Sequence, residues 1–187
     1  MANRLSNLGS VLWDMGDLTA VRAYFEQALE IDRRALGSEH PTVANRLSNL
    51  GSVLRDMGDL TAARAYFEQA LEIDRRALGS EHPTVANRLN NLGSVLRDMG
   101  DLTAARAYFE QALEIDRSAL GSEHPTVAIT LSNLANVQAA TGARDAAISS
   151  YQQAYDILVR IYGPDHRITQ TVRDNLEKAE IGLPEGT

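Results

Sequence analysis

The sequence predicts an all-α solenoid of antiparallel helical hairpins, because it consists of four copies of one unit and each unit holds two amphipathic segments. The four units align without gaps and cover residues 2–43, 44–85, 86–127 and 128–169. The first three are almost identical, whereas the fourth and the last 18 residues diverge, as expected of a terminal cap that faces water. Such a period is typical of repeat proteins, in which each unit packs only against its neighbours. We therefore expect residues 1–187 to form a single repeat domain.

The first segment of each unit has the spacing of a helix with one apolar face. In the second unit, apolar residues follow one another at intervals of three and four over residues 43–57. They are Val43, Leu47, Leu50, Leu54 and Met57. Gly58 supplies a left-handed helix end and Asp59 is a favoured N-cap, so the chain turns within about two residues.

The second segment predicts a longer helix that runs back along the first. Gly79 ends it, and Pro83 is suited to the first turn of the next helix. Connections this short force neighbouring helices to be antiparallel. The last 18 residues supply one more helix, over about residues 168–180, before a Gly/Pro tail. The apolar side of the second helix is expected to bury Leu60, Ala63, Phe67, Ala70, Leu71 and Leu78.

Gly51 indicates close contact between the two helices of a unit. A glycine inside a helix costs about 1 kcal/mol relative to alanine. It recurs as Gly9 and Gly93, which is plausible only where a larger side chain would collide with the partner helix. We expect Phe67 to fill the space beside it.

These residues resemble a known family. Seven of them match the signature of tetratricopeptide repeats: Leu47, Leu50, Gly51, Leu54, Ala63, Phe67 and Ala70. The usual later proline is replaced by Arg75, so the second helix runs on and the unit has 42 residues rather than about 34. Residues 78–86 and the Asn49-Leu50 pair are similar to kinesin-light-chain-type repeats. The resemblance implies a right-handed superhelical solenoid of four repeats, with a C-terminal capping helix and tail over residues 170–187.

A polar stripe on the first helix of each unit is the main indication of function. In the second unit, Asn45, Asn49 and Ser52 lie on one face, away from the leucines. The family arrangement implies that this face lines the concave surface. An asparagine amide both donates and accepts, so a column of asparagines could bind the backbone of an extended peptide. Arg55 and Arg97 flank the stripe and could pair with carboxylates. The expected peptide-binding residues are Asn7, Asn45, Asn49, Ser52, Arg55, Asn87, Asn91, Ser94, Arg97 and Asn133.

Two alternatives stay open for this stripe. Its residues are also typical of a solvated helix face, and Asn49 could instead bond neighbouring helices. Trp13, which stands where later units have Arg55 and Arg97, is either a stacking platform in the groove, a cover for the terminal helix, or an incidental change.

Catalytic and metal sites are not expected. The recurring histidines His40, His82, His124 and His166 are at least one interhelix spacing of about 8–10 Å apart, too far to share an ion. The acid pair Glu68 and Glu72 is flanked by Arg64 and Arg76, which indicates surface ion pairs. No phosphate loop, dinucleotide motif or catalytic triad order is recognisable. We expect a non-enzymatic protein without a cofactor.

The charge balance narrows the class of partner. With 18 Lys+Arg against 25 Asp+Glu, the net charge is −7, which argues against nucleic acid. No apolar run is long enough for a signal or a membrane span, so we expect a cytoplasmic protein that binds a protein or peptide. The alternative is a structural array without a groove ligand, because the first hairpin lacks a cap and could associate end to end with another molecule.

Overall fold

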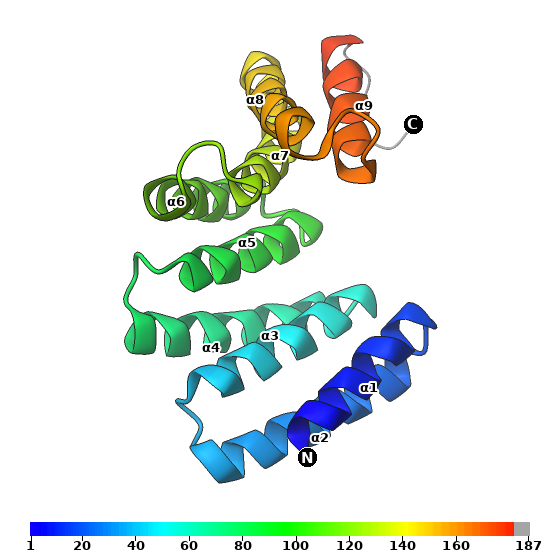
Figure 1. The fold of residues 1–187 in the computed structure, drawn as a ribbon, viewed down its shortest axis with the longest axis vertical. Helices are drawn as coiled ribbons and strands as arrows, with labels where there is room; N and C mark the ends of the chain where they lie inside the picture. Colours follow the sequence, from blue (N-terminus) through cyan, green and yellow to red (C-terminus); the bar gives the residue numbers. More distant parts are fainter. Residues whose placement is uncertain (182–187) are drawn as a thin grey trace. The chain divides into compact units, whose positions relative to one another are not determined.

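The computed structural model describes residues 1–181, and within them every regular element is a helix (Figure 1). The elements are α1 (Ala2–Asp14), α2 (Leu18–Leu36), α3 (Pro41–Asp56), α4 (Leu60–Leu78), α5 (Pro83–Asp98), α6 (Leu102–Leu120), α7 (Pro125–Ala140), α8 (Arg144–Tyr162) and α9 (Arg167–Ile181). The contacts divide the chain into two compact units, Met1–Met99 with α1 to α5 and Gly100–Thr187 with α6 to α9. The expected Gly/Pro tail, residues 182–187, lies outside the described residues.

The turns within the hairpins form as predicted. Gly58 has a φ of +83°, and the Asp59 carboxylate accepts a hydrogen bond of 3.1 Å from the backbone N–H of Ala62. The connection between hairpins is capped by histidine: the Nδ1 atom of His82 accepts from the backbone N–H of Thr84 at 3.1 Å, directly before Pro83 at the helix start. His40, His124 and His166 accept in the same way. The repeated histidines therefore begin helices.

The core of each hairpin confirms the close approach inferred from Gly51. A Cβ atom at this position would lie 2.8 Å from the ring of Phe67. Phe67 belongs to α4 and is buried, with its ring beside Gly51 of α3. Ala63 and Ala70 are also fully buried.

Three residues expected in the apolar core are not buried, and one of them, Leu60 at the start of α4, is half-buried. Met57 lies just after the end of α3 and is 40% exposed, while Leu78, the last residue of α4, is 38% exposed. A residue at the end of a helix has neighbours on one side only, so the spacing overestimates its burial. The periodicity also failed to identify Ile73 and Asp74, which are buried on α4.

In the second compact unit, residues 100–187, polar contacts between α7 and α8 replace apolar contacts that the earlier hairpins make. Tyr151 stands at the phenylalanine position of α8, and its hydroxyl donates to Asn136 on α7. The buried Gln138 side chain accepts a 2.9 Å hydrogen bond from the Ser150 hydroxyl. The C-terminal helix α9 packs against α8 and buries Val172 and Leu176. In the part of the chain that the structure describes, no helix is sufficiently long and apolar to cross a bilayer.

Candidate functional site

All ten residues expected to bind a peptide lie at least partly at the surface of the first helices. Nine belong to α1, α3 and α5 in the first unit, and Asn133 belongs to α7 in the second. The exposed ones are Asn7, Asn45 and Asn87; the half-buried ones are Asn49, Ser52, Arg55, Asn91, Ser94, Arg97 and Asn133. Their hydrogen bonds divide them into residues used between repeats and residues whose amides are free.

A buried ion pair joins α2 to α3. Its arginine also bonds Asn3, which is the equivalent on α1 of the stripe residue Asn45. The Nε atom of Arg46 donates to the Asp32 carboxylate at 2.8 Å, and both residues are only 8% exposed. The Nη2 atom of the same guanidinium donates to the side-chain oxygen of Asn3 on α1. One arginine therefore connects both helices of the first hairpin to the second.

The same arrangement joins α4 to α5. Arg88 Nε donates to Asp74 at 2.7 Å, and Arg88 Nη2 donates to the Asn45 side chain on α3. The bond between the first helices spans 43 residues in both cases, one more than the repeat length. Asn45, which we expected to bind a peptide, thus bonds the neighbouring repeat.

A second set of contacts joins the other ends of α1, α3 and α5. Trp13 Nε1 donates to Asp56 at 3.0 Å, and Arg55 Nε donates to Asp98 at 2.5 Å. Trp13 therefore makes the bond that arginine makes one repeat later, and its ring also packs edge-on against Phe25 at 6.1 Å.

Two more of the expected residues are engaged with their surroundings. Arg97 pairs with Asp98 at 3.0 Å, and the Asn91 amide donates to the Ser48 hydroxyl at 3.0 Å. Both arginines that flank the stripe thus share Asp98. The alternative stated for Asn49, a bond to a neighbouring helix, is found at its equivalent Asn91 and, within residues 1–181, not at Asn49 itself.

The column retains free amides at Asn7 on α1 and Asn49 on α3. Neither side chain has a hydrogen-bond partner among residues 1–181, and they stand at equivalent positions in consecutive repeats. An unpaired, half-exposed amide keeps both its donor and its acceptor for a ligand.

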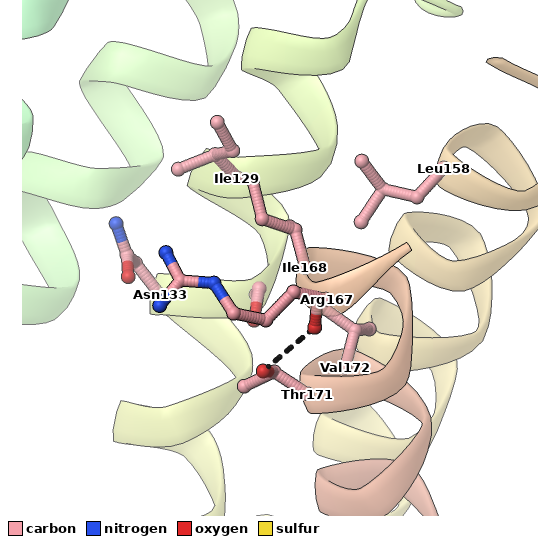
Figure 2. Close-up of a pocket in the computed structure, with 8 residues that line it drawn as sticks. Ile129, Asn133, Leu158, Arg167, Ile168, Thr171 and Val172 are labelled. Carbon is pink, nitrogen blue, oxygen red and sulfur yellow. Dashed lines mark hydrogen bonds between the residues drawn. The ribbon is translucent and has the colours of Figure 1, made fainter. Parts of the chain in front are cut away.

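The second unit contains a pocket of about 330 Å³ at which α7, α8 and α9 meet (Figure 2). Four of its eight described lining residues are aliphatic, and among these eight Arg167 alone is charged. The lining consists of Ile129, Ser132, Asn133, Leu158, Arg167, Ile168, Thr171 and Val172. Figure 2 shows the Arg167 side chain extending from the start of α9 toward Asn133. Neither has a side-chain partner among the described residues.

The sequence interpretation missed this pocket. Arg167 belongs to the divergent last segment, whose place beside α7 follows only from the packing of α9. The one available signal was Ile129, an apolar residue where the earlier units have Asn3, Asn45 and Asn87.

The junction between α6 and α7 has the same buried aspartate but a different partner. Asp116 is 1% exposed, and one of its oxygens accepts from the Thr130 hydroxyl at 2.9 Å. Its other oxygen, Oδ1, is buried without a hydrogen bond. Burial raises the pKa of the Asp116 carboxyl above its ordinary value of 3.8, while the Thr130 hydrogen bond and nearby His124 partly oppose this.

The acidic surface pairs form ion pairs as expected. Arg64 lies 2.8 Å from Glu68, and Arg76 lies 2.7 Å from Glu72, all on the exposed side of α4. Across residues 1–181, no three histidine, aspartate or glutamate side chains are grouped in a way that could hold a metal ion.

Comparison with known proteins identifies the architecture. A sequence model of the tetratricopeptide repeat matches residues 1–76, 45–118 and 84–158. A search of curated proteins finds no match.

Two solved structures illustrate the similarity. A putative kinesin light chain with nearly identical TPR-like repeats from Podosopora anserina is 23% identical, with a TM-score of 0.81, covering 96% of this chain and 85% of its own. BtubC (BKLC) from P. vanneervenii is 21% identical, with a TM-score of 0.84, covering 96% and 72%.

These matches confirm the predicted fold class, an all-α solenoid of helical hairpins with a kinesin-light-chain type of repeat. Together the three matches to the family model cover residues 1–158, which is more than half of the sequence. The chain belongs to the tetratricopeptide repeat family, whose repeats mediate protein–protein interactions.

Proposed function

We propose that this chain is a non-enzymatic scaffold that binds an extended peptide or a partner helix along the face formed by its first helices. The observation that carries the proposal is the set of unpaired amides on those helices, Asn7, Asn49 and Asn87 in the first unit and Asn133 in the second. Amides that are not used in packing can pair with the backbone of a bound strand whatever its sequence.

The contacts between repeats restrict which residues take part. Asn45, Asn91 and Arg55 already bond a neighbouring repeat, so a ligand would have to displace those bonds. Asn7, Asn49, Asn87 and Asn133 need no such exchange. We therefore assign these four residues the main part in backbone recognition and the other six a supporting part in shaping the face.

The pocket beside α9 adds an apolar contact within the second unit, next to Asn133. Ile129, Ile168 and Val172 can receive an aliphatic side chain. Arg167 lies at the rim and, unlike Arg55 and Arg97, has no carboxylate partner among the described residues. The fourth repeat thus offers the side-chain selectivity that three nearly identical units lack.

Selection from a random peptide library tests the proposal. A phage library of random dodecapeptides is panned against the whole chain, and the affinity of the selected peptides is measured by calorimetry. We expect a variant with Asn7, Asn49 and Asn133 changed to alanine to lose about tenfold or more in affinity, because each lost hydrogen bond removes about 0.5–1.5 kcal/mol.

The matched control removes three exposed amides from the second helices instead, through Gln27→Ala on α2, Gln111→Ala on α6 and Gln152→Ala on α8. This variant should keep the affinity of the parent chain. Circular dichroism verifies that both variants retain their helicity and melting temperature. Selected peptides that bind the asparagine variant as tightly as the parent chain would refute groove binding through these amides.

A structural array without a groove ligand is the second candidate. It is favoured by one observation, the apolar surface that α1 exposes, with Val11 56% and Leu8 44% accessible. Sedimentation over a range of concentrations distinguishes a self-associating array from a monomer.

A further inference from the structure

The outer face of α1 carries an apolar stripe that no described residue covers. Met1, Leu8, Val11 and Met15 lie at spacings of seven, three and four residues, which places them along one side of the helix. Their exposed fractions are 90%, 44%, 56% and 74%. Arg4 belongs to the same stripe and is also exposed.

The repeats show what covers this face elsewhere in the first unit. Leu50 and Val53 on α3, the equivalents of Leu8 and Val11, are 0% exposed. The helix that precedes α3 and packs against it is α2. The same holds for α5, which packs against α4. The face of α1 therefore has the same apolar residues that α3 and α5 bury against α2 and α4, and it is suited to bind a helix similar to these two.

Arg4 indicates the charge that a helix bound to this face would carry. Its equivalents, Arg46 and Arg88, are buried and donate to Asp32 and Asp74 on the preceding helix. In both helices the aspartate ends the same five residues, Ala-Leu-Glu-Ile-Asp. Arg4 has no acidic partner among the described residues.

We propose that the outer face of α1 binds a partner helix that carries the Ala-Leu-Glu-Ile-Asp pattern, with its aspartate paired to Arg4 and its apolar residues over Leu8 and Val11. The binding continues an interface that the first unit already contains twice. This binding does not use Asn7, Asn49 or Asn133, so its test is independent of the test of peptide binding along the first helices.

An intact second copy of this chain is a poorer occupant. Its helices with the aspartate, α2, α4 and α6, keep Asp32, Asp74 and Asp116 at most 8% exposed. At the same position α8 has Leu158, which is fully buried. No described helix of a folded copy therefore presents the aspartate of this pattern to Arg4, and the occupant is a helix from outside the folded repeats.

A helical peptide tests the proposal directly. The probe is a fluorescent 19-residue peptide that copies residues 60–78, stapled between positions 64 and 68, and its helicity is verified by circular dichroism. Fluorescence anisotropy with the full chain is expected to show saturable binding, with added hydrogen-exchange protection in α1. Arg4→Glu should weaken binding about tenfold or more, because it replaces an attraction by a repulsion.

Charge exchange supplies the stringent control. A peptide with Asp74→Arg should bind the parent chain about tenfold more weakly and regain affinity for the Arg4→Glu chain. The matched variant Arg34→Glu makes the same charge change at an exposed arginine of α2 and should leave affinity unchanged. The double variant Leu8→Ser and Val11→Ser should abolish binding while the melting temperature is retained.

Three outcomes would overturn the proposal: no saturable binding of the helical peptide, equal effects of Arg4→Glu and Arg34→Glu, or unaltered protection of α1. A concentration-dependent dimer that disappears on Leu8→Ser would assign the face to a second copy instead.

Discussion

The junctions between consecutive repeats place an aspartate at the same buried position but neutralise it differently. At the α2–α3 and α4–α5 junctions, Asp32 and Asp74 face Arg46 and Arg88. At the α6–α7 junction, Asp116 instead accepts a hydrogen bond from the uncharged Thr130 hydroxyl. A buried carboxylate is tolerated when its charge is paired, and otherwise its pKa rises. Hairpins with nearly identical sequences can therefore differ in how the buried aspartate at their junction is compensated, by a charged arginine or by a neutral hydroxyl.

The α8–α9 junction completes this series without any charge. Leu158 and Val172 stand at the positions of the aspartate and the arginine, and both are buried. Because replacing a buried ion pair by apolar residues is often neutral or stabilising, the capping end needs no specific pairing. The ion pairs instead enforce one register between repeats whose apolar faces are almost alike, as buried polar groups do in some coiled coils.

The largest expected effect comes from breaking one of these pairs. Arg88→Met leaves Asp74 as an uncompensated buried charge and should lower the free energy of unfolding by about 3–5 kcal/mol. Chemical denaturation followed by circular dichroism measures the loss. Arg76→Met is the matched control, since its guanidinium is 64% exposed and its pairs should contribute less than about 1 kcal/mol. Equal losses in the two variants would contradict the importance of the buried pair.

A double substitution should have the opposite sign. Asp74→Leu combined with Arg88→Val copies the apolar pair of the capping end and removes both charges together. The unfolding free energy is expected to stay the same or rise, by up to about 4 kcal/mol. Either single substitution alone should be destabilising, so the full double-mutant cycle is measured. A double variant as unstable as Arg88→Met would show that the ion pair itself supplies the stability.

The α6–α7 junction should respond to pH in a way that the paired junctions do not. Because the folded-state pKa of Asp116 is raised, the folded state binds a proton more tightly than the unfolded state. The opening free energy of this junction should therefore increase as pH falls through the raised pKa, and the increase is complete below the ordinary value of 3.8. Amide hydrogen exchange of α6 and α7, corrected for intrinsic rates, measures the change.

The control for the pH effect is Asp116→Asn, which keeps the size of the side chain and removes the charge. It should make this junction insensitive to pH over the same range and raise its opening free energy near neutrality by about 1 kcal/mol. A persistent pH response in this variant would contradict the assignment of the effect to Asp116.

The smallest effect concerns Trp13. Trp13→Arg gives α1 the residue that stands at this position in the second repeat, and it should preserve the bond to Asp56, as Arg55 bonds Asp98. The expected change in unfolding free energy is within about 1 kcal/mol, arising from the lost packing against Phe25. Thermal melting measures it, and a larger loss would show that the indole anchors the first hairpin.

Local patterns predicted the helices and the hairpin contacts. The turn at Gly58 and Asp59, the proline starts and the collision between Gly51 and Phe67 each depend on residues within one unit. These features follow from backbone geometry and side-chain volume, which sequence spacing expresses directly. The burial of Met57 and Leu78 was overestimated because the same spacing carries no information about where a partner helix stops.

The candidate site was predictable only in part, because its residues are shared between repeats. Arg46 resembles a solvated arginine in its own helix, and its burial depends on Asp32 and on Asn3, which lies 43 residues earlier. The same tertiary bonding engages Asn45 and Asn91, whereas Asn49 remains free. The pocket at Arg167 required the position of α9, which no periodicity specifies.

The repetition of one bonding scheme at the α2–α3 and α4–α5 junctions has an evolutionary consequence. Each arginine reaches an aspartate 14 residues before it, so the pair is carried by the end of one unit and the start of the next. Duplicating or deleting a whole unit of 42 residues recreates the same junction on both sides. The length of such an array can therefore change by unequal crossing-over without a new interface having to evolve.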